Sequence, residues 1–362
     1  MVKPRSGVRR TVLAALGGML VVALPGFCSE AAVASAAPAL AYVKQTEQSL
    51  STVWTAAADG SAAARLGPGV SPLISPNGQA VAAGVFGTVA GSQETGPAIA
   101  VYSTATGAAQ DYLSLGSDTA TPIAWSADSR YVAVQLQSTT IPEDAQQHSG
   151  LVVIDTSTGT VITVAHGQIE GASFATDGSD RIVYGRAPSQ LESASVNLYV
   201  ANPDGSDAHA LTHDGHSLNP VWGHGYIAYD HSRYRREGSE LQIWLAPLNG
   251  RAPHRLTHIP VNVLDAGLVP LAISSDGKRM LAEFEGEDNS EAWTVSVGSG
   301  RARELSSSPL LGVGLSRDGR TVLVEEGGLE GPAFGDKLAT VPFAGGRPRV
   351  LVAHAFQASW SE

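Results

Sequence analysis

The stretch Leu198-Tyr199-Val200-Ala201-Asn202-Pro203-Asp204-Gly205 places a run of apolar and β-branched residues directly before a tight turn. Such a run predicts a β-strand that enters a hairpin. The same pattern recurs along the chain, and a dipeptide ending in glycine follows each run. The dipeptides are Asp59-Gly60, Thr106-Gly107, Thr158-Gly159, Asp204-Gly205, Asn249-Gly250, Ser299-Gly300 and Gly345-Gly346, at intervals of 47, 52, 46, 45, 50 and 46 residues.

A second series lies between these dipeptides. In each unit a large apolar residue is followed by a small residue and a turn, as in Trp125-Ser126 and Trp222-Gly223, and then by another strand such as Tyr131–Val134. Each unit therefore holds four short strands, named A to D. Four antiparallel strands in a repeat of this length are typical of a β-propeller blade.

The sequence thus predicts an all-β fold, a seven-bladed β-propeller of four-stranded antiparallel blades. The run Leu40–Val43 takes the role of a strand B, and Phe356–Ser361 takes that of a strand A. We expect these two ends to complete one blade together, so that pairing of the N- and C-terminal strands closes the ring and removes an exposed edge.

Three segments carry a family resemblance: Pro122–Asp128, Leu198–Gly205 with Leu211-Thr212, and Asn219–Trp222. Here the chain resembles the TolB-like propeller repeat, a relative of the WD-type repeat, over about residues 40–362. The resemblance implies an exported platform that binds a partner, most often a protein, and supplies no catalytic residues. The family's namesake has an extra N-terminal domain and a propeller usually counted at six blades, so its role in an outer-membrane complex is not carried over.

Residues 1–39 have the three-part layout of a secretory signal peptide and short leader, and residues 40–362 form the predicted propeller domain. Lys3, Arg5, Arg9 and Arg10 form a positive segment, and an apolar run follows from Thr11 to Leu24. Cleavage after Ala34, Ala36 or Ala39 would fit. Two alternatives stay open: Arg9-Arg10 loosely resembles a twin-arginine signal, and Cys28 is a candidate lipidation site. We therefore expect an exported protein of the cell envelope or extracellular space.

The net charge of −11 argues against a nucleic-acid partner. Loss of residues 1–39 removes four cations and one acid, which moves the net charge to −14. The single cysteine excludes an internal disulfide and a cysteine-based zinc site. We expect a monomer that does not span a membrane in its mature form, with no cofactor and no metal.

In a propeller blade the A–B and C–D turns share one face of the disc, called here the turn face. The B–C and D–A loops share the other, called the loop face. The B–C segments are long and varied, as in His231–Glu240, so the sequence places recognition of an envelope protein or glycan on the loop face.

Candidate binding residues on the loop face are Arg233, Tyr234, Arg235, Arg236 and His231, with His213 and His216 in a D–A loop. Arginine and tyrosine are favoured in interfaces, so the cluster could anchor an anionic partner. The competing interpretation is a solvated loop that balances Glu237 and Glu240, and for the histidines a set of unrelated loop residues.

An alternative function is a propeller hydrolase or lyase, resembling a lactonase, with His213, His216 and His258 at the mouth of the channel on the loop face. The chain has no Gly-x-Ser-x-Gly elbow and no phosphate-binding loop, and no spacing singles out a catalytic residue. A third possibility is a sensor domain from a larger assembly. The sequence therefore favours a non-catalytic binding platform.

Overall fold

The computed structural model describes residues 37–44, 51–88, 95–113, 117–138, 148–187, 195–235, 238–261, 266–286, 290–327 and 336–361. The chain divides into two units, Met1–Ser35 and Ala36–Glu362. Residues 1–36, with Cys28 and the predicted cleavage positions after Ala34 and Ala36, lie outside the described residues. Ala39, the third predicted cleavage position, is described, and its N–H donates to the Ala56 carbonyl at 2.9 Å. Within them, no helix is long and apolar enough to cross a bilayer.

The second unit is built from four-stranded antiparallel sets. Blade 1 is β4 (Val70–Ile74), β5 (Ala80–Thr88), β6 (Thr95–Ser103) and β7 (Ala109–Leu113); blade 2 is β8 (Thr119–Trp125), β9 (Tyr131–Gln137), β10 (Gly150–Asp155) and β11 (Thr160–His166). Blade 3 is β12 (Gln168–Phe174), β13 (Ile182–Ala187), β14 (Asn197–Ala201) and β15 (His209–Ala210); blade 4 is β16 (Ser217–Trp222), β17 (Tyr226–Arg235), β18 (Gly238–Pro247) and β19 (His254–Arg255).

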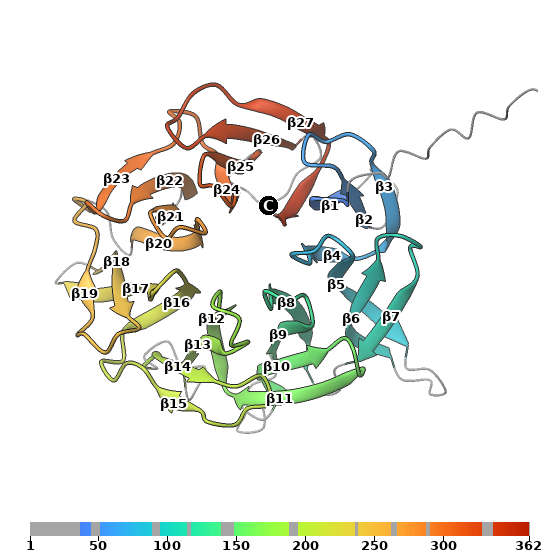
Figure 1. Ribbon diagram of the computed structural model, residues 1–362, viewed down its shortest axis with the longest axis horizontal. Coiled ribbons are helices and arrows are strands. Elements are labelled where there is room, and N and C mark those ends of the chain that lie inside the picture. The colour runs from blue at the N-terminus through green and yellow to red at the C-terminus, as the bar shows by residue number, and fades with distance from the viewer. Residues whose placement is uncertain are drawn as a thin grey trace, which may run out of the picture. The chain divides into compact units, whose positions relative to one another are not determined.

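The remaining sets follow in the same order. Blade 5 is β20 (Ala266–Ile273), β21 (Arg279–Glu285), β22 (Ser290–Ser296) and β23 (Arg301–Glu304); blade 6 is β24 (Leu311–Leu315), β25 (Thr321–Glu326), β26 (Lys337–Pro342) and β27 (Arg349–Ala353). Blade 7 is β28 (Phe356–Trp360) with β1 (Leu40–Lys44), β2 (Thr52–Ala56) and β3 (Ala64–Pro68). Figure 1 shows the colours running once around a ring, with strand A of each blade innermost.

The ring closes as the sequence predicts. Strand β28 pairs with β1 in antiparallel register, with Leu40 opposite Trp360 and Ala41 opposite Ser359. The Ser361 N–H also donates to the Ala39 carbonyl at 2.9 Å. The two ends of the propeller therefore share one sheet, which removes two exposed strand edges.

Blades 4 and 5 are joined by a parallel contact between β18 and β20, which pairs Glu240 with Ala266 and Leu241 with Gly267. Gly267 has a φ of 153°, and a Cβ atom there would lie 2.0 Å from the Leu241 carbonyl oxygen. Only glycine permits this approach. The paired residues Glu240 and Leu241 lie near the start of β18, on the side of the loop face.

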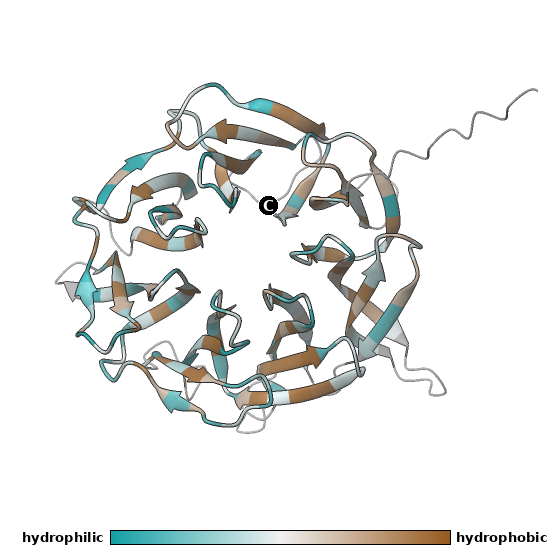
Figure 2. Cartoon of the chain, in the orientation of Figure 1, coloured by the Kyte–Doolittle hydropathy of each residue, from teal (hydrophilic) through white to brown (hydrophobic). Residues whose placement is uncertain are grey.

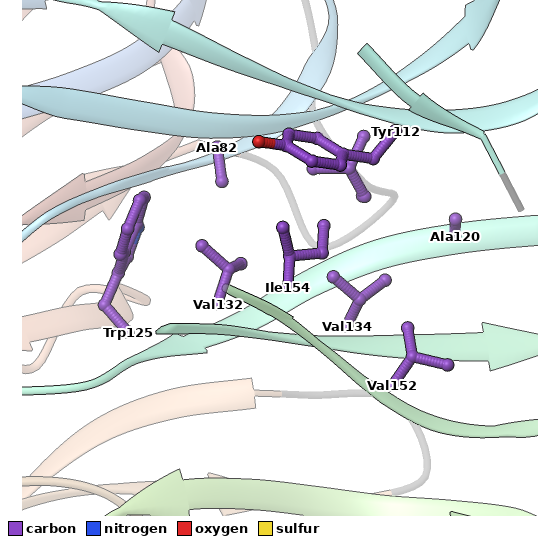
Figure 3. Packing of buried hydrophobic residues seen from close by; sticks show 9 residues of the cluster. Ala82, Tyr112, Ala120, Trp125, Val132, Val134, Val152 and Ile154 are labelled. Carbon is purple, nitrogen blue, oxygen red and sulfur yellow. The ribbon is translucent and has the colours of Figure 1, made fainter. Parts of the chain in front are cut away.

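The core lies between adjacent blades. Figure 3 shows one interface, where Tyr112 of blade 1 packs with Trp125, Val132 and Ile154 of blade 2. The Trp125 indole N–H donates to the Leu73 carbonyl of blade 1 at 2.8 Å. The hydropathy view shows hydrophilic segments on the outermost strands β7, β19 and β23 and hydrophobic residues further in (Figure 2). Burial of apolar surface between blades is the main stabilising term.

The predicted C–D turns are present. Gly60, Gly107, Gly159, Gly205, Gly250 and Gly300 have φ between 66° and 83°. In the seventh turn the first glycine of the dipeptide, Gly345, takes this conformation with a φ of 77°, and Gly346 has a φ of 144°. This left-handed conformation suits glycine because it has no Cβ, which explains why the dipeptides could be found from the sequence.

Candidate binding site at the channel mouth

A cavity of about 550 Å³ opens at the centre of the turn face and is lined by residues of all seven blades. Its rim comes from one position of the repeat, the residue after the small residue in each A–B turn. The rim residues are Pro76, Ala127, Thr176, His224, Ser275 and Arg317, from blades 1 to 6. The ends of the A strands form the wall below, with Ile74, Trp125, Phe174, Ile273, Leu315 and Trp360.

Local hydrogen bonds hold these turns in place. The Ser126 hydroxyl donates to the Asp128 carboxylate at 2.5 Å. The equivalent serines of blades 5 and 6 each donate to the carboxylate two residues later, at 2.7 Å. In these three turns serine and aspartate fix the backbone, and the residue between them, Ala127, Ser275 or Arg317, lines the cavity. The residue type at the rim position can therefore differ from blade to blade.

The rim differs from the wall in chemistry. Arg317 is exposed, and its carbonyl accepts hydrogen bonds from the Ser275 N–H and hydroxyl, both at 2.9 Å. The wall presents the aromatic side chains of Trp125, Phe174 and Trp360. Aromatic faces beneath a cation suit a ligand that combines apolar or sugar surface with an anionic or polar group.

A second cavity, of about 700 Å³, adjoins the first over blade 7. The two share Pro76, Arg317, Trp360 and Ser361 in their linings. The second cavity adds Asp59 and Arg349 among its charged groups. Together the cavities form a groove, called here the mouth groove, that runs from the centre of the turn face across the closing blade.

The structure corrects the predicted loop of residues 231–240. Strands β17 and β18 extend through it, and their register pairs Arg233 with Glu240 and Arg235 with Gly238. Arg233 is exposed on this hairpin. The side chains of Tyr234 and Arg235, and residue Arg236 altogether, lie outside the described part of the structure. The loop was predicted from its polar composition, which a paired, solvent-exposed hairpin satisfies equally well.

A buried polar network fixes the base of this hairpin. Arg255 Nη2 lies 3.0 Å from Glu240 Oε1, and the Gln242 amide donates to the same oxygen at 3.0 Å. The Thr257 hydroxyl donates to Gln242 Oε1 at 3.0 Å and accepts from the Ile243 N–H at 2.9 Å. These bonds tie β18 to the segment that follows β19, so the hairpin has a rigid base.

Two of the three predicted histidines come together on the loop face. The His216 and His231 rings lie 6.1 Å apart, and the His231 ring lies 4.9 Å from that of Trp244. Asp214 Oδ2 lies 3.5 Å from His231 Nε2. Burial lowers the pKa of His231, although the carboxylate of Asp214 opposes the shift. His213 is exposed, and no contact brings it into this group.

No group of three or more His, Cys, Asp or Glu residues able to hold a metal ion occurs in the described ranges. His224 lies in an A–B turn on the opposite face, and His209 and His254 lie in the D strands β15 and β19. The six cavity-rim positions above were not singled out from the sequence. Three of them, Ala127, Ser275 and Arg317, carry a signal in the sequence, because a serine precedes and an aspartate follows each one.

Acidic residues, one buried and two half-buried, occupy another repeat position that sequence reasoning missed. Asp230, Glu283 and Glu325 are the fifth residues of the B strands in blades 4, 5 and 6, counted from the A–B turn. Burial raises the pKa of Asp230 and of Glu283 to about 7, and it also raises the pKa of Glu325. The Glu325 carboxylate accepts from the Ala358 N–H of the next blade at 2.8 Å. These acids brace the A strands that surround the channel.

Neither a protein-family model nor a curated protein matches the chain. Solved structures do match in fold. TolB from Acinetobacter baumannii is 13% identical with a TM-score of 0.51, over 89% of this chain and 82% of that one. The fold is that of a TolB-like β-propeller.

Two further structures agree with this fold. The propeller domain of the trilobed protease from Pyrococcus furiosus is 10% identical with a TM-score of 0.54, over 77% of this chain and 83% of that one. That propeller has an open velcro topology, whereas β1 and β28 pair here. An oligogalacturonate lyase in complex with manganese is 11% identical with a TM-score of 0.52, over 76% and 79% of the two chains. At these identities the likeness concerns the fold alone.

Proposed function

We propose that this protein is an exported, non-catalytic β-propeller that binds a protein or glycan of the cell envelope. The observation that carries the proposal is the mouth groove, where six turn residues that differ between blades lie above a wall of aromatic and aliphatic side chains. Ligand sites are concave and largely apolar, with a few polar groups that orient the ligand. The mouth groove has this composition, and the repeat holds its rim rigid.

The groove leads us to move the proposed site from the loop face to the turn face. The loop-face site remains a prediction, since His216 and His231 lie together and Arg233 lies on the same strand, β17, as His231. A cavity of about 490 Å³ also opens on that face, beside the exposed Phe86 and Val70. The two faces therefore need to be distinguished by experiment.

Replacing Arg317 and His224 with alanine is expected to weaken binding of the envelope partner at least about tenfold, which is about 1.4 kcal/mol. The loss follows because the double variant removes the rim's cation and its imidazole. Arg233→Ala, which also removes one cation but from the opposite face, is the matched control. The measurement is capture of the partner from solubilised envelope, followed by titration of the purified partner.

If the Arg233→Ala variant loses the partner and the rim variant keeps it, the binding site lies on the loop face and the turn-face assignment is wrong. Equal loss in both variants would indicate a general charge effect, since both variants reduce the positive charge of an acidic protein.

Export is the second part of the proposal, and it rests on the signal-peptide layout of residues 1–39. Mass spectrometry of the mature N-terminus is expected to find a chain that begins after Ala34, Ala36 or Ala39. A lipid on Cys28 would instead identify a lipoprotein. A chain that retains residues 1–39 in the cytoplasm would contradict export.

A hydrolase or lyase is the alternative function, and the grouping of Asp214, His216 and His231 is the observation that favours it. A carboxylate beside an imidazole can orient it as a general base. The burial that lowers the pKa of His231 would favour its neutral form. Turnover of a lactone or a uronate oligomer that is lost in His231→Gln would support this alternative against the binding function.

A further inference from the structure

A third cavity on the turn face, of about 330 Å³, lies between blades 5 and 6 and is lined by three arginines. Its lining consists of Arg279, Arg301 and Arg303 with Thr294, Ser296, Phe343 and Ala344. Arg279 begins β21, and Arg301 and Arg303 belong to β23. Phe343 and Ala344 follow β26 of the next blade. This arginine pocket shares no lining residue with the mouth groove.

Two of the arginines are held in place by backbone and hydroxyl groups. Arg303 Nη2 donates to the Phe343 carbonyl at 2.7 Å, and Arg303 Nε donates to the Thr294 hydroxyl at 3.3 Å. Arg279 Nη1 donates to the Gly319 carbonyl at 3.1 Å. The Arg279 guanidinium also lies 5.4 Å from the centre of the Phe343 ring. Each guanidinium keeps further N–H donors for a ligand, because a guanidinium carries five.

The charge of the pocket is not balanced by acids of its own. Its lining contains no aspartate or glutamate, and none of the ion pairs in the described part of the chain involves these three arginines. Asp318 is close enough for Arg279 to help lower its pKa, after hydrogen bonds from Arg320 N–H and Ser316. Its ion pair, however, is with Arg320 at 3.6 Å. The positive charges of the three arginines repel one another, and a bound anion would offset this repulsion.

We propose that the arginine pocket is a binding site for a small ligand that carries a phosphate or sulfate ester. A tetrahedral oxyanion can accept hydrogen bonds from several guanidinium groups at once. The hydroxyls of Thr294 and Ser296 and the ring of Phe343 line the rest of the pocket. Its volume is at the lower end for ligand sites, which fits a monosaccharide phosphate. The arginine pocket and the mouth groove share no lining residue, so the two proposed sites can be tested independently.

Calorimetric titration of the mature protein at low ionic strength tests the site, with inorganic phosphate, inorganic sulfate, glucose 6-phosphate and galacturonate as probes. Arg301→Gln is the first variant, because the Arg301 side chain makes no hydrogen bond or ion pair that supports the fold within the described residues. We expect it to weaken phosphate and glucose 6-phosphate binding about tenfold. Added salt should weaken binding to the unchanged protein.

Arg251→Gln is the matched control, since Arg251 is an exposed arginine that follows the C–D turn of blade 4, outside the pocket. It should leave phosphate binding unchanged. Equal weakening by the two variants would show a general charge effect and overturn the site. No binding of phosphate, sulfate or glucose 6-phosphate would also overturn it. Tighter binding of galacturonate than of glucose 6-phosphate would overturn the proposed ligand class.

Discussion

Replacing Asp230 with asparagine is expected to stabilise the folded propeller at pH 8 and to change its stability little near pH 4. Asp230 is fully buried, and burial raises its pKa to about 7. The folded chain therefore keeps a proton on Asp230 between about pH 4 and 7 that the unfolded chain has released. Stability falls as the pH rises through this window, and asparagine removes that loss. The gain at pH 8 has an upper bound of about 4 kcal/mol.

Burial is the main cause of the raised pKa, and Asp230 also lacks a backbone donor that the equivalent acids of the next two blades have. Glu283 and Glu325 occupy the same position in the next two blades, and each accepts a backbone N–H from the neighbouring A strand, at Gly312 and Ala358. The register places Pro270 of β20 where Gly312 lies in β24. Proline has no N–H to donate. Asp230 Oδ1 accordingly has no hydrogen-bond partner in the described structure, and the Asn219 side chain bonds the carboxylate instead.

The measurement is the free energy of unfolding in urea at several pH values. Asp204→Asn is the matched control, because it makes the same substitution in an exposed turn where hydrogen bonds from the side chain and backbone of Ser206 lower the pKa. A lowered pKa stabilises the fold above about pH 4, so this control should lose a little stability at neutral pH. Destabilisation by Asp230→Asn at pH 8 would contradict the argument.

Closing the ring with a disulfide is expected to have the other large effect. Ala41 and Ser359 lie directly opposite each other across β1 and β28. Cysteines at both positions, in a chain with Cys28→Ser, should form a bridge across the closing blade. The oxidised protein should unfold at a higher temperature than the same protein after reduction, with a gain of about 5 kcal/mol or less.

Deletion of residues 356–362 tests the same closure from the other side. It removes strand A of blade 7 and uncovers Leu40 and Tyr42, both fully buried in the intact propeller. The truncated chain should lose cooperative thermal unfolding. A truncated chain that unfolds at the temperature of the intact protein, or oxidised and reduced double-cysteine proteins that unfold at the same temperature, would show that β28 does not close the ring.

The blades could be predicted because their turns need particular residues. The seven C–D glycines adopt left-handed φ values that other residues rarely take, so their spacing marks the repeat. The pairing of the N- and C-terminal strands could be predicted from the same repeat, because each end of the propeller holds only part of a unit. The β18–β20 contact could not be predicted, because it depends on which edges of neighbouring blades approach, and a single residue, Gly267, marks it.

The candidate site was predicted less well, and the reason is physical. Charged clusters such as Arg233–Arg236 are conspicuous in a sequence, yet their exposure says nothing about where the surface is hollow. The mouth groove is assembled from single residues of all seven blades, such as His224 and Arg317, which lie far apart in the chain. Finding it required the ring geometry as well as the repeat. The arginine pocket likewise joins strands of blade 5 to the turn after β26 of blade 6.

The most direct test of the binding function is site-specific photocrosslinking in intact cells. A photoreactive amino acid replaces Ser275 on the rim of the mouth groove, and in a control chain it replaces Val350, which is exposed on the outer strand β27. We predict one discrete crosslinked product, an envelope protein or glycan, from position 275 and none from position 350. The same products from both positions, or none from position 275, would contradict a binding site at the channel mouth.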